Sequence, residues 1–254
     1  MVEYDGADFA GWQRQRHART VQQAVEEALA AVAAHPIEVV CAGRTDAGVH
    51  ALHQVIHFDS HAYRPSIAWI RGTNSHLPES VRLLWVNEVS PDFHARFKAQ
   101  RRTYCYVIAS RPVRPALLRQ RAAWTYKDLD AERMHQAGQL LVGEHDFSAF
   151  RAAECQAQHA RRQVFQLSVL RRGDYLYLHV EANAFLHHMV RNIAGVLMAV
   201  GAGEQPVEWV GEVLAGRDRR LAGVTAPPQG LYLVGVNYPA EYGLPPAGPP
   251  PVFS

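Results

Sequence analysis

The sequence predicts an α+β fold built from two α/β domains, and three observations support this prediction. Apolar residues follow the order β-α-β-β-α-β over residues 1–100, with period-two runs separated by helical spacing. A further set of strands and helices follows over residues 101–238. Each set ends with a helix, a proline-containing loop and a strand, which indicates an internal duplication.

In the first domain, a capping-box pattern at Thr20 opens a helix whose apolar residues repeat at helical spacing until Pro36. Pro36 cannot continue a helix, so the chain should leave it there. The remaining predicted elements of this domain are strands at 37–42, 53–60 and 81–89, and a shorter helix at 66–74.

The second domain begins with a β-branched and aromatic strand at 102–110, followed by a helix at 129–143 with Asp130 as its N-cap. The turn "RRGD" predicts a hairpin between 161–170 and 175–182. Helices at 185–201 and 207–216 and a last strand at 230–239 complete the domain. In the first of these helices a core stripe at helical spacing is predicted, formed by Met189, Val190, Ile193, Val196 and Leu197. The segment 239–254 holds 6 of the 15 prolines and is expected to be disordered.

Composition narrows the class of protein. With 254 residues, 48% of them hydrophobic, the chain can bury a sizeable core. It contains no apolar run of membrane-spanning length and no signal-peptide pattern, so we expect no membrane association and a cytoplasmic location. Three well-separated cysteines are typical of reduced thiols rather than of a disulfide framework.

The basic residues are almost all arginine: only Lys98 and Lys127 of the 26 are lysine. The arginines form clusters at 96–102, 111–121, 161–162 and 217–220. Guanidinium groups suit phosphate oxygens and stack on bases, so a nucleic-acid partner is one interpretation. The other is a GC-rich genome, which encodes arginine where other genomes encode lysine. Charge alone leaves both open.

A loop at 43–48 carries the strongest candidate for chemistry. Asp46 lies beside Arg44 and between Gly43 and Gly48, in a predicted turn between two strands. An aspartate in a turn commonly bonds the local backbone, which is the structural interpretation. Glycines also allow a backbone to approach a ligand, and a nearby arginine favours the ionised carboxylate. Such a carboxylate can act as a nucleophile or base on a sugar.

Aromatic residues and a helix arginine offer candidate binding groups. Tyr104 and Tyr106 share one face of a strand, where they can pack or can stack on unpaired bases. Arg191 follows His187 and His188 by helical spacing, which predicts either a solvated helix face or a functional arginine paired with Asp46.

The 14 histidines raise the question of a metal site. His50, His53 and His57 are close in sequence, but no HExxH or Cys/His ligand spacing is present. We therefore predict no metal site and no cofactor.

Several motifs together resemble one known family. "YDGADFAGWQRQ", "AGRTDAGVHALHQVIHF", "RRTYCYVI" and "NAFLHHMVRNIAG" occur in the order found in the bacterial tRNA pseudouridine synthase A family, and the similarity extends from residue 3 to about 238. "GRTDAGVHA" and "FLHHMVRNI" are its most specific motifs.

The resemblance implies two pseudo-symmetric domains, each with a mainly antiparallel, RRM-like sheet and helices on one face, meeting at a basic central cleft. It further implies a homodimer that isomerises uridine at positions 38, 39 and 40 of the tRNA anticodon stem-loop, without metal or cofactor. By the same resemblance Asp46 is the essential aspartate and Arg191 its partner. Tyr104 stacks on the base, Arg44 handles the flipped nucleotide, and Leu233 walls the pocket.

Two other classes of protein remain as alternatives. A non-catalytic RRM-like RNA-binding module explains the aromatic strand, but the sequence lacks the RNP1 pattern and this reading gives the Asp46 loop no purpose. A metal-dependent hydrolase would need ligands of the usual spacing.

Overall fold

The computed structural model describes residues 1–155 and 157–253, and the chain falls into two compact units. The first contains Met1–Gln100 and Tyr232–Pro250, and the second contains Arg101–Leu231 and the last residues from Pro251. The sequence analysis assigned 232–238 to the second domain. In the structure this segment belongs to the first unit, because its strand pairs with a strand of that unit.

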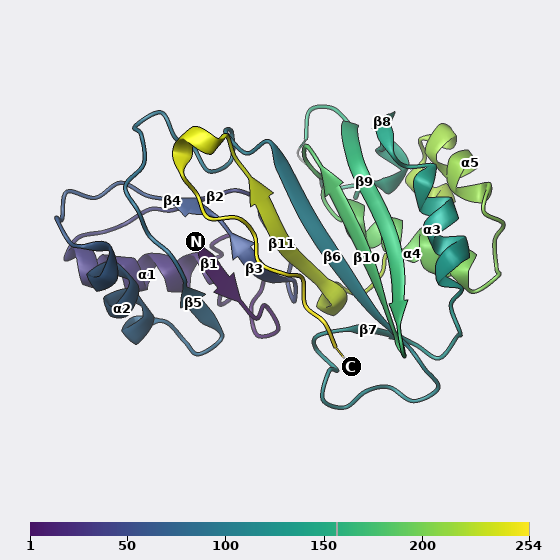
Figure 1. Cartoon of the computed structure of the whole chain (residues 1–254), viewed down its shortest axis with the longest axis horizontal. Helices are drawn as coiled ribbons and strands as arrows, with labels where there is room; N and C mark the ends of the chain where they lie inside the picture. The colour runs from purple at the N-terminus through teal and green to yellow at the C-terminus, as the bar shows by residue number, and fades with distance from the viewer. Residues whose placement is uncertain (156, 254) are drawn as a thin grey trace. The chain divides into compact units, whose positions relative to one another are not determined.

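The first unit contains a sheet with the strand order β5-β1-β3-β11 (Figure 1). Its strands are β1 (Val2–Tyr4), β3 (His50–Gln54), β5 (Val81–Leu83) and β11 (Leu231–Asn237). β1 is antiparallel to β3 and β5, whereas β11 runs parallel to β3 with Leu233 opposite Ala51. A small separate ladder joins β2 (Val40–Cys41) to β4 (Ile56–His57).

Two helices of the first unit, α1 (Val21–Ala33) and α2 (Ser66–His76), pack against each other (Figure 1). Thr20 is the N-cap of α1, and its side chain accepts a hydrogen bond from the Gln23 amide, as the capping-box pattern predicts. Val25 and Leu29 are fully buried on the inner face of α1. The predicted first helix is thus confirmed.

One predicted strand is much shorter than the sequence indicates. The sequence analysis predicts a strand over 81–89, but β5 ends at Leu83. The Leu84 amide donates to the Met1 carbonyl at 2.9 Å, and the Met1 amino group bonds the Trp85 carbonyl at 2.6 Å, so main-chain contacts with the N-terminal segment continue just past the end of the strand.

The second unit is organised around long antiparallel strands in the order β6-β10-β9-β8. They are β6 (Arg101–Ser110), β10 (Tyr175–Ala182), β9 (Arg161–Arg172) and β8 (Gly143–Asp146). The predicted hairpin is confirmed by β9 and β10. A short strand, β7 (Ala123–Thr125), pairs in parallel with the end of β6.

Figure 1 shows α3, α4 and α5 together on one side of these strands. Their bounds are Ala131–Gln139, Met189–Gly201 and Trp209–Gly216. Asp130 caps α3 through bonds from the amides of Glu132 and Arg133. The predicted core stripe of α4 is confirmed, since Ile193, Val196 and Leu197 are fully buried. Short 3₁₀ turns lie at Ser148–Phe150, Arg219–Leu221, Pro228–Gly230 and Ala240–Tyr242.

The proline-rich C-terminal segment, expected to be disordered, makes specific contacts in the structure. Tyr242 is buried, and its hydroxyl bonds the Asp92 carboxylate at 2.7 Å. The Phe253 amide donates to the Tyr177 hydroxyl at 2.7 Å, and Tyr238, the residue just before this segment, donates to the Ala95 carbonyl at 2.6 Å. These aromatic anchors explain the difference, because proline content alone does not measure what the interspersed aromatic residues bury.

The mixed helix and strand content and the mainly antiparallel pairing confirm the α+β class. Within the described part of the chain, the helices are all too short or too polar to span a bilayer.

Candidate active site

Asp46 lies in the connection between β2, which ends at Cys41, and β3, which begins at His50. The Val49 amide donates to the Asp46 carbonyl at 3.2 Å and closes the turn. Gly48 has φ of +75°, a left-handed conformation that glycine adopts without strain. The sequence prediction of a glycine-dependent loop between strands is therefore confirmed.

The segment that follows β1 clamps this loop through main-chain contacts. The Trp12 amide donates to the Thr45 carbonyl at 3.0 Å, and the Gly48 amide donates to the Phe9 carbonyl at 3.3 Å. A Cβ on Gly6 would lie 2.0 Å from the Val49 carbonyl oxygen, so no side chain fits there. Two glycines of "YDGADFAGW", Gly6 and Gly11, thus allow two backbones to lie against each other.

The loop exposes its chemical groups unequally. Arg44 is exposed, Thr45 is buried, and Asp46 is partly accessible. A carboxylate on a backbone fixed from two sides is well placed to present a defined geometry to a ligand, because few rotatable bonds remain.

His50 supports the same region. Its Nδ1 lies 3.0 Å from both the Gly6 amide and the Asp5 carboxylate, and its ring stacks on Tyr232 with centroids 4.7 Å apart. His57 Nδ1 accepts the Ala95 amide proton at 3.1 Å, and His53 Nε2 lies 3.4 Å from the Pro245 carbonyl. The three histidines weighed above as metal ligands thus contact different partners.

Leu233 is fully buried on β11, opposite Ala51 of β3. This places it on the sheet of the first unit, with Ala51 five residues after Asp46 in the chain. The strand was predicted from its apolar residues, but its parallel pairing with β3 was not.

Tyr104, on β6 of the second unit, is buried to 7% exposure and packs edge-on against Phe185 with centroids 5.0 Å apart. Tyr106, two residues on, is fully buried and donates to the Pro227 carbonyl at 2.7 Å. Burial raises the Tyr106 pKa far above its usual range, so this phenol stays protonated. Phe185 was not singled out in the sequence, although its place at the start of "FLHHMVRNI" is a signal.

Arg191 lies on the first turn of α4, where its Nε donates to the Ala226 carbonyl at 2.8 Å. The Ala226 amide in turn donates to the Arg191 carbonyl at 3.1 Å, so the two segments are tied in both directions. This pairing holds one edge of the guanidinium in a fixed orientation.

The expectation that His187, His188 and Arg191 share one face of a helix is wrong. α4 begins only at Met189, and His188 precedes it with φ of +60°, in the left-handed region. The two imidazole rings lie 4.0 Å apart in a turn that enters the helix. A non-glycine residue in this conformation is uncommon and is frequent at functional sites.

Some of the predicted phosphate-binding arginines hold the fold instead. Arg102 is buried and donates to the Asn183 carbonyl at 2.9 Å, and Arg219 bonds the side chains of Asn192 and Thr225. Arg101 is exposed, stacks over Phe165 at 4.2 Å and pairs with Glu181 at 2.7 Å. A count of arginines therefore overstates the surface available to nucleic acid.

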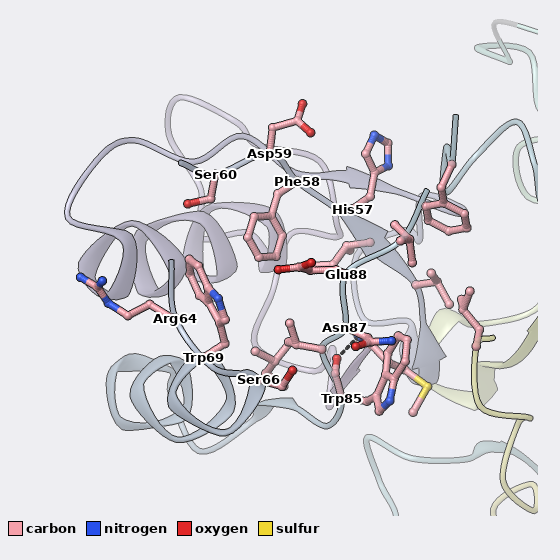
Figure 2. Close-up of a pocket in the computed structure, with 18 of the residues that line it drawn as sticks. His57, Phe58, Asp59, Ser60, Arg64, Ser66, Trp69, Trp85, Asn87 and Glu88 are labelled. Atoms are coloured by element: carbon pink, nitrogen blue, oxygen red, sulfur yellow. Dashed lines mark hydrogen bonds between the residues drawn. The ribbon is translucent and has the colours of Figure 1, made fainter. Parts of the chain in front are cut away.

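A separate cavity of about 590 Å³ lies in the first unit (Figure 2). Aromatic and acidic residues line it, among them Phe58, Trp69, Trp85, Asp59 and Glu88. Arg44, Asp46 and Leu233 do not line it. The cavity is therefore distinct from the Asp46 loop.

Comparison with known proteins decides the family. A family model described as tRNA pseudouridine synthase matches residues 1–98 and 137–239. The chain belongs to this family.

The similarity to individual relatives extends over nearly the whole chain. The chain is 56% identical over 243 residues to tRNA pseudouridine synthase A of Methylococcus capsulatus, and this alignment covers 96% of the chain and 90% of the relative. It is 56% identical over 250 residues to the protein of the same name from Aeromonas hydrophila, covering 98% and 93%. The Tolumonas auensis protein is 53% identical over 250 residues.

Enzymes of this family are isomerases that convert uridine to pseudouridine in tRNA. The matched residues include the Asp46 loop, its N-terminal clamp and Arg191, whereas residues 99–136, with Tyr104, lie between the two matched segments.

Proposed function

We propose that this tRNA pseudouridine synthase isomerises uridines 38, 39 and 40 of the anticodon stem-loop and that Asp46 is its catalytic carboxylate. The observation that carries the proposal is the Asp46 loop, whose backbone is bonded to the Phe9–Trp12 segment on one side and closed by its own turn on the other. The choice of positions 38 to 40 rests on the family resemblance.

The reaction exchanges one bond for another. The N1–C1′ bond of the uridine breaks, the uracil turns, C5 bonds C1′, and the proton on C5 is lost to a base while N1 gains one. An ionised Asp46 can start this sequence by adding to C1′ or by removing the C2′ proton to give a glycal. Both routes use a carboxylate at the ribose and need no metal or cofactor from outside.

Other residues take supporting roles in the proposal. The target base must leave its stack, at a cost of a few kcal/mol, and Tyr104 would stack on the exposed base to offset it. Arg44, exposed beside Asp46, would hold the phosphate of the flipped nucleotide. Arg191 would pair with Asp46, and Leu233 would wall the base pocket.

The assembly is also part of the proposal. We expect a cytoplasmic homodimer with two pseudo-symmetric domains and a basic cleft that receives the stem-loop, as the family resemblance implies. Three free thiols are consistent with a reducing compartment. Light scattering on the purified enzyme should give twice the chain mass, and a fully active monomer would contradict this part.

The substrate is tested with tRNA transcripts labelled by [5-³H]uridine. Only substitution at C5 releases that tritium, so release identifies the reaction directly. Transcripts that keep a single uridine at 38, 39 or 40 should each release tritium in the presence of EDTA, and a transcript without uridine at all three should not. Equal release from the last transcript would place the reaction elsewhere in the tRNA.

A further inference from the structure

Hydrogen bonds behind the Asp46 loop point to two residues outside the roles given above. We propose that Tyr4 and Gln54 are positioning residues for the isomerisation, holding the main chain immediately before Asp46 so that its carboxylate keeps one place. The inference rests on the proposed function of Asp46, and its test separates the two.

Gln54 and Tyr4 reach the loop from two different strands. The Gln54 Nε2 donates to the Gly43 carbonyl at 2.7 Å and lies 3.5 Å from the Tyr4 hydroxyl oxygen. The Tyr4 hydroxyl in turn lies 2.7 Å from Thr45 Oγ1. An amide nitrogen can only donate, so the Tyr4 oxygen accepts from Gln54, and either hydroxyl can be the donor in the bond between Tyr4 and Thr45. The bonds therefore grip the loop at two points, one on each side of Arg44.

All three side chains are withdrawn from water. Gln54 is 0% exposed, Tyr4 3% and Thr45 7%. In such surroundings a hydrogen bond is stronger than at the surface, and water cannot replace a lost partner. The loop before Asp46 therefore has little freedom to shift.

The register of the sheet brings the two side chains together. Val2 of β1 pairs with Gln54 of β3, but Tyr4 pairs with Ala51, so two steps on β1 oppose three on β3. Irregularities of this kind re-aim side chains and are frequent beside active sites. Here the irregularity lies directly after the Asp46 loop in the chain.

A polar atom left without a partner argues against a purely structural role. Among the described residues, Gln54 Oε1 is buried and has no hydrogen-bond partner. Burying an unpaired acceptor is unfavourable, and a methionine could fill the same space without it. A group that is retained at a cost to stability is characteristic of functional sites.

The test compares Gln54→Met and Tyr4→Phe with the wild-type enzyme under single-turnover conditions. Each should slow tritium release by about 10-fold or more, because small displacements of a reacting group are costly, while the tRNA dissociation constant stays within about 2-fold. The melting temperature of Gln54→Met should change little, because removal of the orphaned oxygen offsets the loss of the bonds to the Gly43 carbonyl and the Tyr4 hydroxyl. A merely structural glutamine would lose stability and keep its rate per folded molecule.

Tyr242→Phe is the matched control, because Tyr242 is a buried tyrosine of the same unit whose hydroxyl bonds Asp92 rather than the loop. Its rate should be that of the wild type. Wild-type rates in both Tyr4→Phe and Gln54→Met would overturn the inference, and Tyr4→Phe alone decides if Gln54→Met does not fold. Asp46→Asn in the same series tests the proposed function. Turnover by Asp46→Asn would contradict the proposed role of Asp46 itself. An inactive Asp46→Asn together with wild-type rates in both positioning variants would contradict only the inference about Tyr4 and Gln54.

Discussion

Replacing Gly11 by alanine tests how far turnover depends on the clamp around the Asp46 loop. Gly11 is buried, has φ of +96°, and packs against the loop backbone. A Cβ on this residue would lie 2.8 Å from the Thr45 carbonyl oxygen and 3.1 Å from the Ala47 amide nitrogen. Both atoms belong to residues adjacent to Asp46, so relief of the contact must move the loop or the segment that clamps it.

The size of the effect follows from two terms. A non-glycine residue in left-handed backbone costs about 1–2 kcal/mol, and forced contacts in packed structure cost about 1–3 kcal/mol, so Gly11→Ala should lower the free energy of unfolding by about 2–5 kcal/mol. The contact to Thr45 is about 0.6 Å shorter than the 3.4 Å at which ordinary contact begins. A displacement of that size should slow turnover by roughly 10-fold.

Gly243→Ala is the control, because Gly243 has φ of +60° in the same unit and a Cβ there would meet nothing within 4 Å. This variant has only the cost of a non-glycine residue in left-handed backbone, so its free energy of unfolding should fall by about 1 kcal/mol while its turnover stays at the wild-type rate. Stability is measured by denaturant unfolding and turnover by tritium release, at a temperature where both variants are folded. A folded Gly11→Ala enzyme with wild-type turnover would refute the reasoning, as would equal slowing in Gly243→Ala.

Three further predictions concern pH, one side chain and salt. Burial raises the pKa of the Cys41 and Cys105 thiols from about 9 to about 12, so the folded state holds these protons longer. The free energy of unfolding should then fall as pH rises from 9 towards 12, by about 1 kcal/mol per thiol at pH 10, and a variant with alanine at both positions should lose less. Arg191→Lys keeps the charge but loses the Nε bond to the Ala226 carbonyl and the two-pronged guanidinium that the proposal pairs with Asp46. It should therefore cost about 2–3 kcal/mol of transition-state stabilisation with little change in tRNA affinity, and wild-type turnover would make Arg191 an ordinary helix residue. If about six phosphates are contacted, tRNA affinity should fall by about 10³-fold between roughly 50 and 200 mM salt, and a flat response would remove phosphate contacts from the account.

Local signals in the sequence predicted the parts of the structure that depend on nearby residues. The glycines around Asp46 and the apolar runs beside them are enough to place a loop between strands, because turn chemistry is set within a few residues. The buried stripe of α4 followed from helical spacing in the same way. The identity of the carboxylate as a candidate catalyst needed the family motif in addition.

Long-range pairing could not be predicted in this way. β11 pairs with β3 of the first unit, which lies far earlier in the chain, and nothing in the sequence of β11 indicates which strand it pairs with. The left-handed conformation of His188, which removes the two histidines from the helix, is imposed by tertiary structure rather than by propensity. The packing role of Gly6 and Gly11 could not be predicted from the sequence either, because it depends on contact with a backbone segment more than thirty residues away.

The central claim is that Asp46 carries out the chemistry, and tritium release by Asp46→Asn tests it most directly. Asparagine is nearly isosteric and can keep the hydrogen bonds of a turn, but it supplies neither a negative charge nor a competent nucleophile. Asp8→Asn, an exposed aspartate of the same unit, serves as the control. Melting temperature and filter binding are measured on the same preparations. We predict that Asp46→Asn folds, binds tRNA and releases no tritium above background, while Asp8→Asn behaves as wild type. A folded, tRNA-binding Asp46→Asn enzyme that still releases tritium would contradict the account.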